Sequence, residues 1–351
     1  MHRRSVLTAA SIAAAAPFLP RPTLAQEARI TGGGAVSPRQ AYEKWAQLAQ
    51  GALGVQMTYQ GSNSNTGADQ VVARQLDFAG TDNPKRAGML REQHLIQFPA
   101  VLSAFVPVVN LPGVQPNQLR LTGDLLADLF LGKITKWNDA RLAKENAGLR
   151  LPDMPVVPVH RADPSGPTYY FTTYLTRVSD AWAQGPRASN KVQFPVGESA
   201  TADGGLIEKV RGTPGAIGYT GASNAKAAQL ATVSLKNRAG GFVAPDAASF
   251  AKAAEAGDWS APGFVVEMVD LEAEGAWPIV TPTFILMPSN PAADKVEASR
   301  NTMRFFDWAF KNAGEATAQL GFIPLPAALH APIQQVWRRV KGPDGQPVWE
   351  A

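Results

Sequence analysis

Apolar residues along this chain switch repeatedly between the spacing of a helix and the spacing of a strand. Residues 41–49 place apolar side chains on one helical face, and residues 54–59 alternate apolar and polar positions as a half-buried strand does. Residues 69–76 then return to the helical spacing. Alternation of this kind predicts an α/β architecture, in which helices cover a sheet.

The remainder of the chain continues this alternation. A long apolar run predicts a buried strand over residues 101–109, and apolar residues at helical spacing predict a helix over 296–312 whose aromatic side chains belong to the core. The tail after residue 340 is expected to be a turn followed by a loose end. Further strands are expected at 156–159, 215–219 and 279–287, and a further helix at 123–131.

The first 25 residues have the composition of an export signal. Arg3 and Arg4 precede an apolar, Ala-rich run that holds no acid and is interrupted by prolines. The run is shorter than the ~20 residues that span a bilayer. The arginine pair before Ser-Val-Leu resembles a twin-arginine signal, although a general secretion signal also carries such pairs. We therefore expect residues 1–25 to be cleaved after export, with the twin-arginine route favoured, and the mature protein to be soluble.

The charge of the chain narrows the range of partners. The sequence has 33 basic and 29 acidic side chains, and three of the basic ones lie in the predicted signal, so the mature net charge is about +1. The sequence has no run of Lys or Arg. A protein that binds nucleic acid or an anionic membrane surface usually carries a basic patch, so we expect neither partner.

Cysteine and histidine limit the chemistry further. The sequence contains no cysteine, which excludes a disulfide, a thiolate nucleophile and a thiolate metal site. Its four histidines lie far apart without the spacing of zinc ligands, so we expect no metal site. A chain of 351 residues exceeds what one hydrophobic core usually organises, which predicts two domains.

An arginine just before a predicted helix start gives the first candidate site. Arg161 follows the strand at 156–159, and Ser-Gly-Pro at residues 165–167 is typical of a helix start. A guanidinium offers a planar set of donors to an oxyanion, and a helix N-terminus adds backbone N–H groups and a partial positive charge. The pattern predicts an anion site in which Asp163 fixes the guanidinium. The alternative is a purely structural ion pair between Arg161 and Asp163.

Two earlier segments also lead into predicted helices. The glycines at 32–34 permit close approach of the backbone to a ligand, Ser37 is a suitable N-cap, and Pro38 suits the first helical position. Residues 61–67 are rich in short hydroxyl and amide side chains. Each segment alone is equally typical of an ordinary capped helix or a loop. We hypothesise that the three helix starts converge on one anion between two α/β lobes, at the carboxyl ends of strands.

A carboxylate at a predicted strand end completes the candidate site. Asp82 ends the segment 77–82 and is expected to face the same region. An ionised carboxylate only accepts hydrogen bonds, so it favours an anion that still carries a proton, such as hydrogen phosphate, and repels sulfate. The alternative role for Asp82 is to cap a turn.

An ordered series of short segments extends over nearly the whole chain after the predicted signal. It consists of residues 42–46, 59–61, 77–78, 98–99, 109–113, 131–139 (Leu-Gly-Lys-Ile-Thr-Lys-Trp-Asn-Asp), 161–163, 214–219 (Pro-Gly-Ala-Ile-Gly-Tyr), 276–279, 283–286 and 305–309. In these segments the chain resembles the periplasmic phosphate-binding protein of the phosphate-specific ABC importer, the PstS-like family.

This resemblance implies an α/β, two-lobed periplasmic-binding-protein fold with a ligand cleft between the lobes. The chain would cross between the lobes in two segments, near Ala100 and near Ile279. One lobe would then be discontinuous, formed by residues 26–100 plus 280–351, and the other lobe would comprise residues 101–279.

The resemblance also implies the ligand-binding residues. Asp163 would support the arginine of the site. By motif position, the phosphate ligands are Ser64, Asp82, Arg161, Ser165 and Gly166.

The chain departs from the family pattern in two loops. The family's first loop usually reads Ala-Thr-Phe-Pro, whereas this chain has Val36 and Ser37, and Pro167 replaces the Thr of a Ser-Gly-Thr. We expect Val36 and Ser37 to donate from the backbone, and Ser37 and Thr168 are candidates for the missing hydroxyl. Losing a hydrogen bond to a charged group costs ~1.5–3 kcal/mol, so an uncompensated site would bind phosphate roughly one to two orders of magnitude more weakly.

Together these observations predict a non-enzymatic receptor that captures inorganic phosphate in the periplasm and delivers it to the membrane permease of an ABC importer. The resemblance implies a monomer without a cofactor. One alternative is a related receptor, for uptake or sensing, whose altered loop accepts a phosphonate or an organophosphate. A phosphatase is disfavoured, because the sequence has no Ser-His-Asp order and no metal-ligand cluster.

Overall fold

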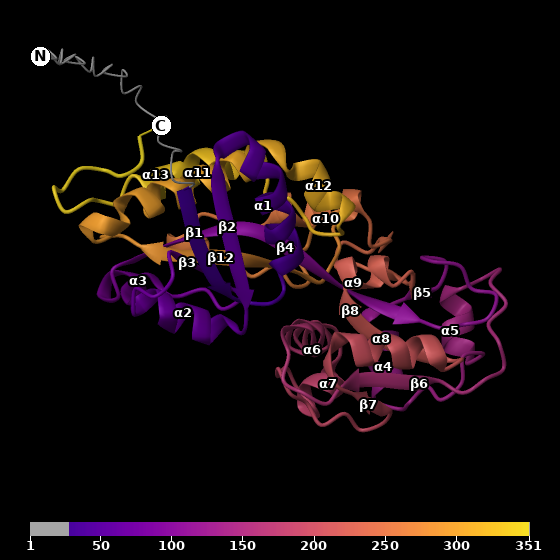
Figure 1. The fold of residues 1–351 in the computed structure, drawn as a ribbon. Helices are drawn as coiled ribbons and strands as arrows, with labels where there is room; N and C mark the ends of the chain where they lie inside the picture. Colours follow the sequence, from indigo (N-terminus) through magenta and orange to yellow (C-terminus); the bar gives the residue numbers. More distant parts are fainter. Residues whose placement is uncertain (1–27, 351) are drawn as a thin grey trace, which may run out of the picture.

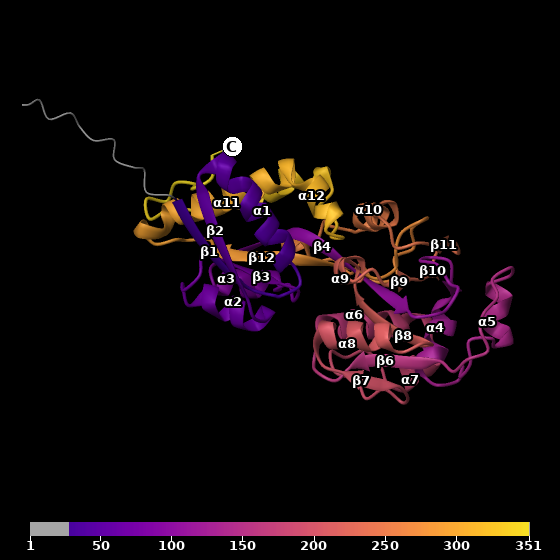
Figure 2. The ribbon, with the colours of Figure 1, turned by 45° about the vertical axis from the view of Figure 1, so that its right-hand side comes forward.

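The computed structural model describes residues 28–350, so the predicted export signal lies outside the described residues. Figure 1 shows two groups of elements, which we call the first lobe and the second lobe. The first lobe combines the indigo N-terminal elements with yellow C-terminal helices, and the second lobe is built from the middle of the chain. Strand β4 (Leu95–Val109) runs from one lobe to the other, as Figure 2 shows from a second direction.

One path of paired strands passes through both lobes, in the order β2-β1-β3-β12-β4-β8-β6-β7, with β9 paired to β4. In the first lobe β1, β2 and β3 are parallel, and β12 is antiparallel to β3 and β4. In the second lobe β6 is parallel to β7 and β8. The strands are β1 (Ala28–Gly34), β2 (Val55–Gly61), β3 (Phe78–Thr81), β6 (Val157–Arg161), β7 (Glu198–Ala200), β8 (Ala216–Gly221), β9 (Ala231–Thr232) and β12 (Val280–Pro288).

Strand β4 is shared by the two lobes. It pairs with β12 from Leu95 to Ala104 and with β8 from Phe105 to Val109. Every residue of β4 is buried, which explains why its sequence is apolar except at Gln97 and Ser103. The lobes are therefore joined where β4 changes its partner.

Aromatic side chains fill the core of the first lobe around Phe306 of α11. The centre of the Phe306 ring lies 5.3 Å from that of Phe78 and 5.5 Å from that of Phe98. This packing confirms the prediction that the aromatic residues of 296–312 belong to the core. The helices of this lobe are α1 (Arg39–Leu53), α2 (Ser64–Val72), α3 (Ala87–Glu92), α11 (Val296–Asn312), α12 (Gly314–Gln319) and α13 (His330–Trp337), with 3₁₀ turns at Ala293–Lys295 and Ala327–Leu329.

The second lobe has its own aromatic core. Phe171 stacks on Tyr219 with ring centres 4.2 Å apart, and Phe130 lies 5.0 Å from Phe171. A small sheet joins β5 (Arg120–Leu121), β10 (Ser234–Lys236) and β11 (Phe242–Val243). The helices from the middle of the chain are α4 (Gly123–Phe130), α5 (Ala140–Glu145), α6 (Gly166–Val178), α7 (Asp180–Gln184), α8 (Ala202–Gly212), α9 (Ala222–Ala227) and α10 (Ala247–Ala256), with a 3₁₀ turn at Pro262–Phe264.

The Gly-rich residues 32–34 lie inside β1, where the structure uses them for packing. A Cβ on Gly32 would lie 2.2 Å from the ring of Phe78. Gly34 has a φ of +114°, and a Cβ there would lie 2.3 Å from the carbonyl oxygen of Gly80. These glycines let β1 lie close to β3, and so they serve the sheet rather than the approach to a ligand that the sequence predicts.

The prediction of a loose C-terminal end is wrong. Val348 and Trp349 are only 3% and 8% exposed, and the ring of Trp349 lies 4.9 Å from that of Trp337. The backbone N–H of Val348 donates to the carbonyl oxygen of Val340, so the chain returns to the core after its turn. Within residues 28–350, no helix has both the length and the apolar character needed to cross a bilayer.

Candidate functional site

A cavity of about 650 Å³ lies between the two lobes. The first lobe lines it with residues 35–37, 39–40 and 62–64 and with Asp82. The second lobe lines it with Arg161 and with residues 163–167 and 202–204. Several of these segments follow the carboxyl ends of β1, β3 and β6, which is where open α/β sheets bind ligands.

The cavity brings together nearly all of the residues that the sequence singled out. Thr168 is the exception, because it is fully buried behind Ser165. The predicted residues that line the cavity are Val36, Ser37, Ser64, Asp82, Arg161, Asp163, Ser165, Gly166 and Pro167.

Hydroxyl groups hold the carboxylate of Asp82 in the first lobe. Ser37 Oγ donates to Asp82 Oδ2 at 2.8 Å, and Thr283 Oγ1 of β12 donates to Asp82 Oδ1 at 2.6 Å. Burial raises the pKa of Asp82, and the two hydroxyl bonds oppose that rise. The carboxylate bonds to side chains of other segments rather than to the backbone of the bend that begins at Asp82, so the turn-capping alternative does not describe it.

Ser37 does not cap α1, contrary to the prediction. Pro38 takes the N-cap position, and the helix begins at Arg39 without a side-chain cap. The hydroxyl of Ser37 instead lies 2.9 and 2.8 Å from the two oxygens of Asp82. A carboxylate is a stronger acceptor than a neutral group, which explains why the hydroxyl is donated there.

Two carboxylates clamp the guanidinium of Arg161 at the end of β6, where the side chain is only 8% exposed. Nε donates to Asp163 Oδ1 at 2.8 Å, and one terminal nitrogen also donates to Asp163. The other terminal nitrogen donates to Asp203 Oδ1 at 2.5 Å. Burial lowers the pKa of Arg161, but the bonds to both carboxylates outweigh it and raise the pKa. The guanidinium therefore stays charged.

The ion pair with Asp163 does not use up the donors of Arg161. A guanidinium has five N–H groups. Within residues 28–350, the bonds to Asp163 and Asp203 leave each terminal nitrogen of Arg161 with a further N–H beside the cavity. The two sequence-based interpretations, an ion pair and an anion site, are therefore compatible.

The start of α6 is organised by its cap. Ser165 Oγ accepts from the backbone N–H of Thr168 at 3.2 Å, and Gly166 and Pro167 are the first two residues of the helix. The Thr168 hydroxyl lies 2.8 Å from both Ser165 Oγ and the Tyr219 hydroxyl. Thr168 thus supports Ser165 from behind, and its position excludes it as a replacement hydroxyl in the cavity.

Asp203 and Thr283 contact the predicted site residues but were not predicted from the sequence. Asp203 is the second residue of α8 and follows the end of β7, the same signal of a carboxylate after a strand that singled out Asp82. Thr283 lies in an apolar strand 201 residues from Asp82, and no local pattern marks it.

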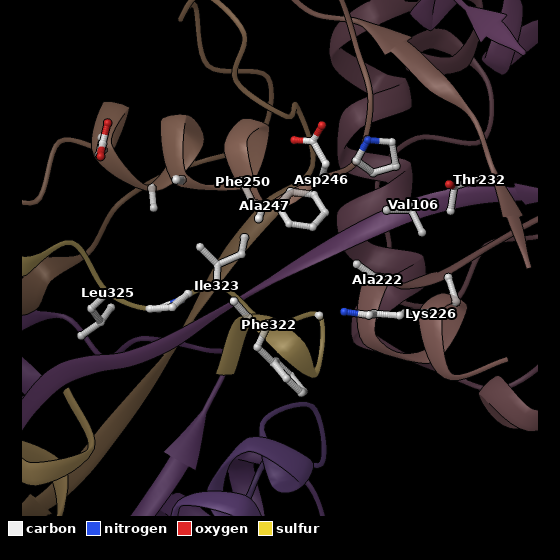
Figure 3. Close-up of a pocket in the computed structure, with 18 of the residues that line it drawn as sticks. Val106, Ala222, Lys226, Thr232, Asp246, Ala247, Phe250, Phe322, Ile323 and Leu325 are labelled. Carbon is white, nitrogen blue, oxygen red and sulfur yellow. The ribbon is translucent and has the colours of Figure 1, made fainter. Parts of the chain in front are cut away.

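A second cavity, of about 660 Å³, adjoins the first at Gly321 and Phe322. Figure 3 shows α10, with Phe250, on one side of β4, and Ile323 close to that strand. The walls are mainly apolar, with Lys226 as one charged contributor. The predicted anion ligands line the first cavity, which is therefore the candidate site. Among residues 28–350, no group of three or more His, Cys, Asp or Glu could hold a metal ion.

Comparison with known proteins agrees with this geometry. A family model described as a PBP superfamily domain matches residues 20–313. The phosphate-binding protein PstS of Pasteurella multocida is 40% identical over 327 residues, which cover 93% of this chain and 94% of the relative.

Solved structures show the same two-lobed periplasmic-binding-protein fold. The phosphate-binding protein from Stenotrophomonas maltophilia matches with a TM-score of 0.62 at 20% identity, covering 88% of this chain and 93% of its own. An ABC-type phosphate transport receptor from Vibrio cholerae matches with a TM-score of 0.54 at 17% identity, covering 85% and 100%. The resemblance found in the sequence is confirmed, and the chain belongs to the PBP superfamily and, within it, to the PstS family of phosphate-binding proteins.

Proposed function

We propose that this protein is a non-enzymatic receptor that binds inorganic phosphate in the cavity between its lobes. One observation carries the proposal: a guanidinium, Arg161, and a half-buried carboxylate, Asp82, line the same cavity from different lobes. Hydrogen phosphate matches both groups, because its oxygens accept from Arg161 while its P–OH donates to Asp82. An oxyanion without a proton would be repelled by Asp82.

In the second lobe, the proposed contacts are the remaining N–H groups of Arg161, the hydroxyl of Ser165 and the backbone N–H of Gly166. The positive end of α6, a helix of 13 residues, favours an anion at the same place. Pro167 contributes no N–H there.

In the first lobe, Asp82 would accept the proton of the ligand. Ser64 Oγ accepts from the backbone N–H of Asp82 at 3.1 Å, so the Ser64 hydroxyl proton remains available to the anion. Val36 and Ser37 would donate from the backbone. The Ser37 hydroxyl is already committed to Asp82, so its proposed role is to hold the carboxylate rather than to replace the family's missing hydroxyl.

We propose that phosphate is enclosed by a hinge motion of the lobes. Residues 26–100 plus 280–351 would move against residues 101–279, about the region where β4 changes partner between Ala104 and Phe105. Closure would bring Asp82 and Arg161 onto opposite sides of one anion and exclude water from it.

The proposed setting is the periplasm, reached through the signal at residues 1–25, with the twin-arginine route as the favoured one. We propose a monomer that delivers phosphate to the membrane permease of an ABC importer, which the name of the Vibrio cholerae relative supports. The names of the relatives are those of binding and transport proteins, and they favour a receptor over a phosphatase.

Calorimetric titration of residues 26–351, stripped of bound anion, tests this function with phosphate, sulfate and a phosphonate in turn. We expect micromolar or tighter binding of phosphate and no response to sulfate. Binding of the phosphonate without phosphate would instead assign the altered-loop alternative. If the protein released phosphate from an ester and Arg161→Ala abolished that release, the function would be that of a phosphatase rather than a receptor.

A further inference from the structure

The candidate cavity carries more negative than positive charge. Arg161 is bonded to both Asp163 and Asp203, and Asp82 adds a third carboxylate from the first lobe. Arg39 also lines the cavity, but it is exposed and paired with Glu43 at 3.6 Å. Arg161 therefore offers oriented N–H donors to a ligand, while the carboxylates of Asp163 and Asp203 already neutralise its positive charge.

One backbone conformation and two hydrogen bonds fix the position of Asp203. Ala202, just before it, has a φ of +57°, a left-handed conformation that residues other than glycine rarely adopt. The backbone N–H of Ala202 donates to Asp163 Oδ1 at 3.0 Å, and Asn224 Nδ2 donates to Asp203 Oδ2 at 3.2 Å. The strained backbone thus holds the two carboxylates on the same guanidinium.

A simpler role for Asp203 would be to stabilise the N-terminus of α8, as acids in a first helical turn do. Asp124 has that position in α4 and is exposed. Asp203 differs because it is half-buried, lines the cavity and contacts Arg161. These contacts place it beside the proposed ligand.

We infer that Asp203 is a specificity-determining residue that makes the cavity select the more protonated form of its ligand, dihydrogen phosphate over hydrogen phosphate. The inference rests on the proposed function. With Asp163, Asp203 removes the net charge that would attract a dianion, and its own oxygens can accept from a second P–OH group.

The groups around Asp203 support the direction of this effect. It faces Arg161 from β6, Asp163 from the following loop, Tyr219 from β8 and the neutral Asn224 from α9. Burial raises the pKa of Asp203, although Arg161 opposes the rise. Burial also raises the pKa of Tyr219 to about 12, so Tyr219 stays neutral near pH 7. Binding should therefore favour an additional proton and weaken as pH rises.

The test is calorimetric titration of the full mature chain with inorganic phosphate from about pH 5.5 to about pH 8.5, the range in which phosphate loses its second proton. We expect wild-type affinity to fall as pH rises. Asp203→Asn should flatten this profile and bind phosphate about tenfold more tightly than wild type at the upper pH. Asp124→Asn is the matched control at the same helical position and should keep the wild-type profile.

The outcomes separate the inference from the proposed function. If the wild type does not bind phosphate at any pH, the proposed function fails. If it binds and Asp203→Asn keeps the wild-type profile, or binds more weakly at every pH, Asp203 only positions Arg161 and the inference is overturned. Titration of the wild type in buffers of different ionisation enthalpy needs no variant: proton uptake on binding near pH 8 is expected, and its absence overturns the inference as well.

Discussion

The two walls of the cavity hold charge in opposite ways. In the first lobe, neutral hydroxyls of Ser37 and Thr283 hold the carboxylate of Asp82, and burial raises its pKa. In the second lobe, a guanidinium holds Asp163, and its hydrogen bonds keep the pKa of that carboxyl far below the usual range. The Arg161–Asp163 pair of the second lobe therefore keeps charges that pH hardly changes, whereas Asp82 of the first lobe is an acid that responds to a proton.

This contrast assigns a different task to each wall. A permanently ionised pair such as Arg161 and Asp163 suits the capture of an anion, because its donors are oriented before the ligand arrives. A carboxylate with a raised pKa suits discrimination, because it accepts a proton from one anion and repels another. Substitutions in one wall or the other should therefore impair capture and discrimination separately.

The largest expected effect is the loss of capture in Arg161→Gln. The substitution removes the charged donors and leaves Asp163 and Asp203 without their cation, so phosphate affinity should fall at least about a hundredfold. Calorimetry with phosphate measures this. Arg141→Gln is the control, because Arg141 also pairs with two aspartates, at 3.2 and 3.0 Å, but on the exposed surface of the second lobe. Equal losses in both variants would contradict the assignment.

Discrimination should be lost in Asp82→Asn. The amide can donate a hydrogen bond to an unprotonated oxygen, so the preference for phosphate over sulfate should fall by about tenfold or more. Competition binding with the two anions measures the ratio. Asp77→Asn alters a carboxylate just before the same strand, held by the hydroxyl of Thr31 at 2.9 Å, and should leave selectivity unchanged. Unchanged selectivity in Asp82→Asn would exclude the discriminating role.

A smaller effect is expected from Thr283→Val, which keeps the buried shape and removes one donor to Asp82. Because that donor stabilises the ionised form, its loss should raise the pKa of Asp82 further. As pH falls, phosphate selectivity should then begin to fail at a higher pH than in the wild type, and affinity near pH 7 should weaken about two- to tenfold.

The experiment is to measure the preference for phosphate over sulfate at several pH values in Thr283→Val and in the wild type. Thr302→Val removes a buried hydroxyl of the first lobe that donates to the carbonyl of Ala298 at 2.8 Å, away from the cavity. It should lower stability without moving the selectivity profile. A profile that moves equally in both variants would refute the role of Thr283.

The smallest effect concerns stability in Asp163→Asn. The folded-state pKa of Asp163 is lowered, so its ionised form stabilises the fold above the ordinary pKa of 3.8, and this stabilisation is lost as pH falls toward the folded value. Near pH 7 the variant should melt about 2–4 °C lower than the wild type, and the gap should shrink below about pH 4.

Thermal unfolding of Asp163→Asn and the wild type near pH 7 and below about pH 4 tests whether the difference in melting temperature shrinks in acid. Asp153→Asn breaks a fully exposed pair with Lys136 and should change the melting temperature less. A difference in melting temperature between Asp163→Asn and the wild type that widens in acid would contradict a stabilising role for the ionised Asp163 carboxylate.

Local patterns predicted much of the fold. The helix over 296–312 and the strands near 157–161 and 216–221 were found because their apolar spacing depends only on neighbours in sequence. The packed tail after Val340 escaped prediction, because turn residues such as Lys341-Gly342-Pro343 do not reveal that Trp349 reaches the ring of Trp337.

The sequence by itself determined the α/β class, the family, and the pairing of Arg161 with Asp163, which lies only two residues further along the chain. Only the tertiary structure decided which hydroxyls donate to Asp82 and which second carboxylate bonds to Arg161. Those contacts join Asp82 to Thr283 across 201 residues and Arg161 to Asp203 across 42. They form because β12 is placed between β3 and β4, and because α8 begins beside the end of β6; strand order and helix placement of this kind arise only when the lobes fold.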